Sequence, residues 1–402
     1  MIALRDRCRS RRAAPALVAV LLLSGCAGHQ LSSARTAFYA GRPAEAAQLL
    51  AEAKTTGRDR VLVLMERGTM RMAAGDYMGS VADFIQAHDE VERMTAVQVA
   101  QGTTSLVVND TVQDYTGVPF ERTLLHAMAA HDHFAVADWE KAAVEARRIL
   151  NTLEDKARGD YPDVAYARYL AGFCLQMMDD ESNAALQFRK AAALVPGLAI
   201  DDRTGRIGPA SAASGPAELV CFIFIGGLHN PAAGSSVSKL EKTAFAEIHH
   251  EGHLLGRSHN LSDTVDLAFT TEQKEAAKKL AKTAARVAIK ETVSYQIAQD
   301  NELLGELVRL ILVGILEQPD LRRWETLPRW LQVARVPCPA DLTSFDVVFK
   351  NHQGVTTRTV SVTEPLARRR NTFVSYCRDL PTSTAPAPTL APAPAAVDPA
   401  TR

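Results

Sequence analysis

The chain has 402 residues, of which 47% are hydrophobic and 23% charged, so it has room for two or three domains with apolar cores. Its 45 basic side chains balance 46 acidic ones, giving a net charge of −1. This balance excludes the broad basic surface that nucleic-acid binding requires, and we expect no nucleic-acid partner.

Residues 1–25 have the layout of an export signal, with a basic start, an apolar run and small residues at the exit. The apolar run from Ala16 to Leu23 has eight residues, well short of the ~20 that a membrane-spanning helix needs. It ends in Leu-Ser-Gly-Cys, which resembles the lipobox of bacterial lipoproteins, where the cysteine is acylated before the signal is cut. We therefore expect acyl chains on Cys26 that anchor the protein in a membrane.

The residue after Cys26 indicates which membrane holds the anchor. Lipoproteins of this class that stay in the inner membrane carry aspartate there, and this chain has Ala27. The resemblance therefore implies an outer-membrane anchor with the folded body facing the periplasm.

Four cysteines follow the lipobox, at positions 174, 221, 338 and 377, and none of them forms a CxxC pair. Cys338 and Cys377 both fall in a strand-rich region, and the periplasm allows disulfides. The sequence leaves two alternatives for these two cysteines, a disulfide between them or buried free thiols.

Residues 26–200 have the pattern of tetratricopeptide-like helical repeats, in which small residues lie where the two helices of a unit cross. Gly172 and Phe188 have this spacing, and Gly68 and Phe84 repeat it 104 residues earlier. The unit with Gly68 turns at Gly75-Asp76-Tyr77, a weak first unit turns at Gly41, and a further unit turns at Asp138-Trp139. A generic helical bundle is the alternative. A stack of such repeats curves and exposes an inner groove, where peptides or protein segments bind.

The third unit turns 62 residues after the second, instead of the usual period of about 34, so an insertion precedes it. Long loops without regular structure are often functional. We expect partner contacts from this insertion and from the first helix of the last unit, at Asp110, Asp114, Tyr115, Glu121, Arg122 and Arg168. Alternatively, the two aspartates make turn hydrogen bonds and Phe120 fills the end of the repeat core.

After a Gly/Ser/Pro-rich linker at 201–217, residues 218–380 predict a smaller mixed α/β domain, so the overall class is α+β. The apolar run Leu219 to Ile225 is typical of a strand buried on both faces. An amphipathic helix begins at Thr270, and short strands with a hairpin turn at residues 351–354 follow. Residues 381–402, rich in proline and alanine, predict a disordered tail.

The pattern Arg322-x-Trp324-x-x-Leu327-Pro328 is the most unusual of this half. Together with the stretches at 109–110, 117–122, 145–148 and 333–337, it resembles a family of uncharacterised Gram-negative lipoproteins. The resemblance implies a tetratricopeptide-like helical half before a mixed domain. Some members are encoded beside lipoproteins that activate peptidoglycan synthases. The resemblance spans most of residues 26–350 and leaves out 228–263.

That unmatched stretch contains His249, His250, Glu251 and His253. A zinc protease needs two histidines four residues apart on a helix, with the general-base glutamate directly after the first. His249 and His253 have the spacing, but Glu251 is one position late and Gly252 weakens a helix. A solvated surface cluster is one interpretation and metal binding by His249 and His253 the other.

We therefore expect a lipid-anchored scaffold or adaptor without catalytic residues or cofactor. Its repeat groove would bind another envelope protein, one concerned with cell-wall assembly. The alternative is an envelope hydrolase or metal-binding enzyme that uses His249, Glu251 and His253.

Overall fold

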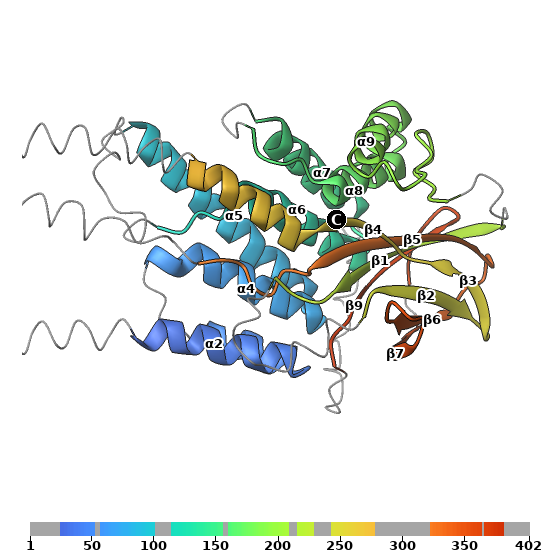
Figure 1. Cartoon of the computed structure of the whole chain (residues 1–402), viewed down its shortest axis with the longest axis horizontal. Helices are drawn as coiled ribbons and strands as arrows, with labels where there is room; N and C mark the ends of the chain where they lie inside the picture. The colour runs from blue at the N-terminus through green and yellow to red at the C-terminus, as the bar shows by residue number, and fades with distance from the viewer. Residues whose placement is uncertain are drawn as a thin grey trace, which may run out of the picture.

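A computed structural model of the chain describes residues 25–52, 57–100, 114–155, 160–208, 215–228, 243–277, 322–363 and 366–381. The export signal before Gly25, Asp110 and the tail from residue 382 lie outside the described residues. Helices occupy the first half and strands most of the second, so the fold is α+β, as predicted (Figure 1). No helix in the described ranges is long and apolar enough to cross a membrane.

The described part of the first half forms four consecutive helix pairs. They are α2 (Gly25–Tyr39) with α3 (Pro43–Ala51), α4 (Arg60–Ala73) with α5 (Tyr77–Ala100), α6 (Pro119–Ala135) with α7 (Trp139–Glu154), and α8 (Ala165–Met177) with α9 (Glu181–Leu194). A short 3₁₀ turn, η1 (Gly57–Asp59), precedes α4.

All four pairs turn in the same way. A residue with positive φ follows each first helix: Gly41 at 79°, Gly75 at 84°, Ala137 at 57° and Asp179 at 67°. The next residue's N–H then bonds to the carbonyl oxygen five residues back, at 2.8 to 3.0 Å, which is the Schellman way of ending a helix. The sequence had placed turns at Gly41, at Gly75 and at Asp138, and the structure confirms these positions.

Two pairs share a close helix crossing. A side chain at Gly68 would start 2.7 Å from the ring of Phe84, and one at Gly172 would start 3.0 Å from the ring of Phe188. Glycine at the crossing therefore lets each phenylalanine pack directly on the facing backbone, as the 104-residue spacing predicted.

The second half forms two sheets and a helix at 264–277. The five-stranded sheet has the order β4 (His259–Asp263), β5 (Trp330–Cys338), β1 (Ala217–Ile225), β9 (Thr372–Arg378) and β8 (Ala367–Arg369). The four-stranded sheet has the order β3 (His253–Arg257), β2 (Phe245–His250), β6 (Ser344–Lys350) and β7 (Thr356–Thr363). Strand β1 runs antiparallel to β5 and parallel to β9.

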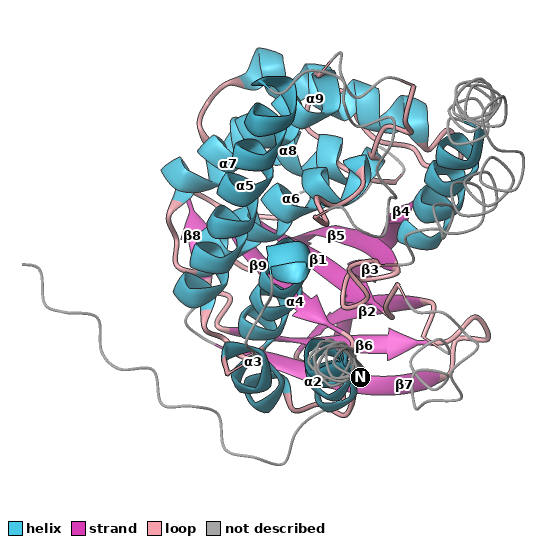
Figure 2. Cartoon of the chain, turned by 90° about the vertical axis from the view of Figure 1, so that its left-hand side faces the viewer, coloured by secondary structure: helices cyan, strands magenta, loops and turns pink. Residues whose placement is uncertain are grey.

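Strand β1 is buried on both faces, which confirms the sequence prediction. Phe222 and Phe224 belong to the core shared with the helices, whereas Cys221 and Ile223 belong to the core between the two sheets. The molecule therefore has three layers: helices, the five-stranded sheet and the four-stranded sheet (Figure 2).

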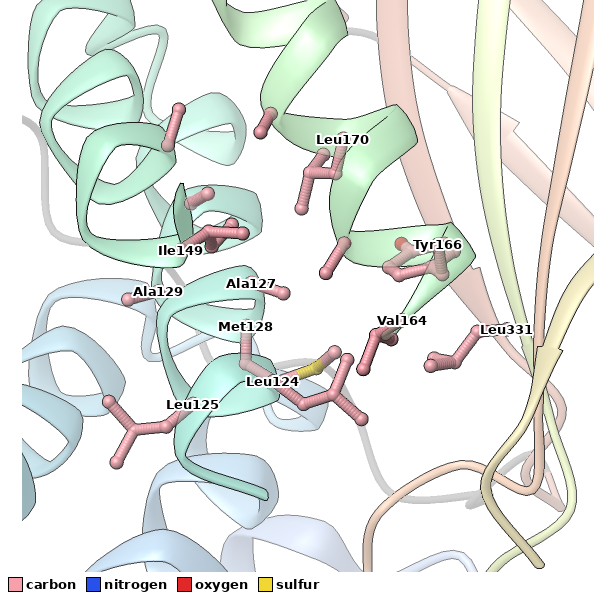
Figure 3. Close-up of a cluster of buried hydrophobic side chains, with 14 of the residues drawn as sticks. Leu124, Leu125, Ala127, Met128, Ala129, Ile149, Val164, Tyr166, Leu170 and Leu331 are labelled. Atoms are coloured by element: carbon pink, nitrogen blue, oxygen red, sulfur yellow. The ribbon is translucent and has the colours of Figure 1, made fainter. Parts of the chain in front are cut away.

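The helix core continues directly into the five-stranded sheet. Figure 3 shows Leu124 and Met128 of α6, Tyr166 and Leu170 of α8 and Leu331 of β5 in one buried cluster. Apolar packing therefore joins the two halves of the chain that the expected linker at 201–217 connects. The inner surface of the helix pairs, where the sequence suggested an open groove, is covered by the chain's own sheet.

Candidate functional site

The inner surface of the helix pairs holds a loop of the chain itself, residues 322–327, which turns at 325–326 and leads towards β5. Trp324 at its centre is fully buried. Its indole Nε1 donates to Thr69 Oγ1 at 3.0 Å, and its ring lies 5.8 Å from that of Phe84. This 322–327 segment includes the Arg-x-Trp pattern that the sequence singled out.

Glu66 of α4 binds the 322–327 segment from one side. Its fully buried carboxylate accepts bonds from the Arg35 guanidinium at 2.5 Å, from the N–H of Glu325 at 2.9 Å and from the hydroxyl of Thr326 at 2.5 Å. Hydrogen bonds to an ionised group are about twice as strong as neutral ones. Glu66 therefore ties α2, α4 and the segment together.

Glu121 of α6 binds the segment from the other side. Its buried carboxylate accepts from the Tyr115 hydroxyl at 2.5 Å and from the N–H groups of Trp324 and Val118, both at 2.9 Å. Burial raises the pKa of Glu121, while these three bonds act against the rise. The Arg322 guanidinium lies 5.6 Å from the centre of the Tyr115 ring.

The structure thus brings Tyr115 and Glu121, two predicted contact residues, together with Arg322 and Trp324. Both predicted residues are buried and bind the chain's own segment. Asp114 is exposed and Arg122 is half-buried. Phe120 lies in the shared core, as the alternative interpretation of the insertion expected.

Arg168 is on α8, the first helix of the last pair, but belongs to a different network. It is only 4% exposed, and its guanidinium binds Asp163, Glu154 and Gln187, each at 3.0 Å. These bonds join α7, α8 and α9. A partner contact at Arg168 stays a prediction, and the structure gives this residue a role in the fold.

A cavity of about 180 Å³ lies where the helices meet the edge of both sheets. We call it the His131 cavity. Tyr77 of α5 and His131 and Phe134 of α6 line one side, and Tyr376 of β9 lines the other, with Val362 and Leu366 completing the apolar wall. One water molecule needs only ~15 Å³ of such space, so the cavity has room for a small ligand or a side chain.

His131 lines this cavity, and the next residue of α6, Asp132, is a second buried titratable group. His131 Nε2 is 2.6 Å from the Tyr166 hydroxyl, and burial lowers the pKa of His131 to about 3, so the ring is neutral at neutral pH. Burial raises the pKa of Asp132 well above its usual value. Strongly shifted pKa values beside a cavity mark a candidate binding site.

The histidine cluster at 249–253 is a β-hairpin, which corrects the helical geometry that the zinc-site interpretation required. Glu251 and Gly252 form its turn with φ of 50° and 80°. His250 pairs with His253 across the hairpin, while His249 pairs with Leu254, so His249 and His253 lie on opposite faces. Within the described ranges, no three histidine, cysteine or acidic side chains are grouped to hold a metal ion.

All four described cysteines beyond the lipobox, at positions 174, 221, 338 and 377, are buried free thiols. The disulfide between Cys338 and Cys377 is therefore not formed in the structure. Burial raises the pKa of Cys338 to about 11 and that of Cys377 to about 12, so both thiols stay protonated and unreactive.

Sequence reasoning missed Glu66, Tyr77, Asp132 and Tyr376. Glu66 follows the apolar run 61–65 of α4, and Asp132 lies among the buried residues of α6. An isolated acidic residue within an apolar helix was the available signal, since such a residue is rarely buried without a specific partner. The partners of Glu66 on the 322–327 segment were not visible, because they lie more than 200 residues away in the sequence.

Comparisons of the chain with protein-family models, curated proteins and solved structures find no match.

Proposed function

We propose that the protein is a lipid-anchored scaffold of the bacterial envelope. In this proposal Cys26 carries the anchor in the outer membrane, the body faces the periplasm, and the helix pairs bind another envelope protein concerned with the cell wall. Residues 26–200 would be tetratricopeptide-like repeats, and the chain would belong to the lipoprotein family that its Arg-x-Trp pattern resembles.

The observation that carries this proposal is the position of Cys26 in the first turn of α2. Ala34 and Phe38 of the same helix are fully buried in the body. Cys26 precedes Ala34 by eight residues, or ~12 Å of helix at 1.5 Å per residue. Acyl chains on Cys26 would therefore hold the helix pairs close to the membrane surface.

Support for repeats comes from the shared turn of all four pairs and from the glycine crossings at Gly68 and Gly172. Because the inner surface is covered by the sheet, we place the partner contact on the outward second helices. Exposed apolar side chains there include Val144 of α7 and Leu186 of α9, which are 41% and 39% exposed.

Replacing Cys26 tests the anchor. We expect Cys26→Ser to release the protein from the membrane without changing its melting temperature, because acylation acts outside the core. Membrane flotation and circular dichroism of the released protein measure the two effects. Flotation of Cys26→Ser with the outer membrane would show that the lipobox interpretation is wrong.

Site-specific photocrosslinking in intact cells tests the partner contact. A photoreactive residue at Val144 or Leu186 should give one discrete adduct with an envelope protein, and the same residue at Val355, exposed on the opposite layer, should not. Identical adducts from all three positions, or none from the helices, would contradict the proposed surface.

A further inference from the structure

The His131 cavity is large enough for one aromatic ring and opens to the surface. Its volume is about 180 Å³, and an apolar cavity of about 150 Å³ engineered into another protein binds benzene. Two of the residues that line it, Ala135 at the end of α6 and Thr363 at the end of β7, are exposed. A small ligand can therefore reach the cavity from solvent.

Aromatic rings form much of the cavity wall. Tyr77 of α5 and Tyr376 of β9 meet edge to face, with ring centres 6.2 Å apart. The ring of His131 lies 6.1 Å from that of Phe134 and 6.4 Å from that of Tyr376. Pairs of rings in edge-to-face or offset geometry attract each other in addition to the effect of burial. The wall therefore favours a flat aromatic ligand over an aliphatic one of the same size.

The residues of the wall also have unused hydrogen-bonding groups. The Tyr376 hydroxyl donates its proton to the carbonyl oxygen of Met72 at 2.6 Å, so its oxygen can still accept a bond. The Tyr166 hydroxyl, whose pKa burial raises well above its usual value, is protonated and lies 2.6 Å from Nε2 of His131. It donates to Nε2, since the described residues give it no other acceptor, and the neutral His131 ring therefore carries its proton on Nδ1. Within the described residues Nδ1 has no hydrogen-bond partner, so it is an unused donor.

The wall favours a neutral ligand. The described residues that line the cavity are tyrosine, phenylalanine, valine, leucine, alanine, serine and threonine side chains together with neutral His131, so none of them is charged at neutral pH. An ion would lose its hydration there without an opposite charge to replace it, which is costly. A hydroxyl group needs only one donor and one acceptor, and Nδ1 of His131 and the Tyr376 oxygen supply them.

We propose that the His131 cavity binds a small neutral phenol. The phenol ring packs against Tyr77, Phe134 and Tyr376. Its hydroxyl donates to the Tyr376 oxygen and accepts a bond from Nδ1 of His131. Leu366 contacts the apolar edge of the ring. This site is independent of the lipid anchor and of the proposed partner contact on the outward helices.

Calorimetric titration of the full mature chain with phenol at neutral pH tests the proposal. We expect saturable binding at one site. Benzene, which lacks the hydroxyl, and cyclohexanol, which lacks the aromatic ring, should each bind at least tenfold more weakly. Benzoate and benzylammonium should not bind, because the described wall offers neither ion an opposite charge.

Ala367→Phe is the variant that should fill the cavity. Ala367 is half-buried on β8 and lines the cavity, so a phenyl ring at this position takes the space that the ligand would occupy. Phenol affinity should fall at least tenfold. Ala82→Phe, at an exposed position of α5 outside the cavity, is the control and should bind phenol like the wild type.

A second variant tests the hydroxyl contact without filling the cavity. His131→Phe combined with Tyr166→Phe removes the donor at Nδ1 and leaves no buried hydroxyl without a partner. This double variant should lose the preference for phenol over benzene while it still binds benzene. Tyr166→Phe alone keeps the His131 ring and should retain the preference.

The phenol ring can come from a free small molecule or from a tyrosine side chain of another protein. Titration with N-acetyltyrosinamide distinguishes the two sources: its binding would show that the cavity accepts a tyrosine side chain, and binding of phenol alone would restrict the cavity to free phenols. No saturable binding of phenol, equal affinity for phenol and benzene, or full phenol affinity in Ala367→Phe would overturn the proposal.

Discussion

Gly172 is a residue whose role is packing. It lies in the helix crossing of α8 and α9, where a Cβ atom would start 3.0 Å from the Phe188 ring and 3.1 Å from the Ala184 carbonyl oxygen. Neither neighbour has free space, because Phe188 and Ala184 are both fully buried.

We expect Gly172→Leu to lower the free energy of unfolding by ~1 to 3 kcal/mol through overpacking, visible as a lower melting temperature by circular dichroism. The control is Gly197→Ala, at an exposed position where nothing lies within 4 Å, and it should melt like the wild type. If Gly172→Leu also melts unchanged, the helices do not cross as closely as described.

His131 and Asp132 make opposite contributions to the pH dependence of stability. In the unfolded chain His131 binds a proton below pH ~6.5, whereas in the folded protein it stays neutral until the pH approaches 3. His131 therefore lowers the stability of the fold as the pH falls over this range. Folded Asp132 keeps a proton that the unfolded chain loses above pH ~3.9, so Asp132 reduces stability as pH rises. Between pH 4 and 6 the two contributions oppose each other.

Asp132→Asn should therefore steepen the loss of stability between pH 6 and pH 4 by up to ~1.4 kcal/mol per pH unit, the value for one proton. Urea unfolding at pH 4, 5 and 6 measures the slope, and Asp114→Asn should leave it unchanged. An unaltered slope in Asp132→Asn would mean that Asp132 is ionised in the folded protein.

At the scale of elements, the 322–327 segment is held by side chains from three helices, α2, α4 and α6. The bond from Trp324 Nε1 to Thr69 Oγ1 is the part that can be tested alone. Thr69→Val leaves a buried indole N–H without an acceptor, which costs about 1 to 3 kcal/mol, whereas Trp324→Phe removes the donor as well.

In a double-mutant cycle, Thr69→Val and Trp324→Phe should show a coupling of ~1 kcal/mol in urea unfolding. Thr95→Val is a matched control, because both threonine hydroxyls donate to the carbonyl oxygen four residues back, Thr69 at 3.0 Å and Thr95 at 2.9 Å. The Thr95 bond is unrelated to Trp324. Thr95→Val and Trp324→Phe should be additive; similar coupling in both cycles would rule out a specific Trp324–Thr69 bond.

At the scale of the whole molecule, one hydrophobic core contains side chains of both halves, including Phe134 of α6 and Phe222 of β1. Independent domains would each need a core of their own. We therefore expect a single cooperative unfolding transition, with the helical signal in circular dichroism coinciding with tryptophan fluorescence.

A fragment of residues 26–208 should accordingly fail to fold, because it exposes the apolar side of α6 and α8 that the sheet covers. Far-ultraviolet circular dichroism and size-exclusion chromatography of the fragment test this. A monomeric fragment that melts cooperatively would instead show that the helix pairs are an independent domain.

The sequence by itself determined the features that depend on nearby residues. Turn residues located three of the four helix-pair turns, the apolar run located β1, and residues 351–354 located the β6–β7 turn. Only the tertiary structure decided which distant residues meet. It covered the inner surface with a sheet, buried Arg168, turned His249–His253 into a hairpin and joined Glu66 to Thr326 across 260 residues. The physical reason is that periodicity and turn chemistry act over a few residues, whereas a buried carboxylate or an apolar face is satisfied by whichever distant segment the whole fold brings to it.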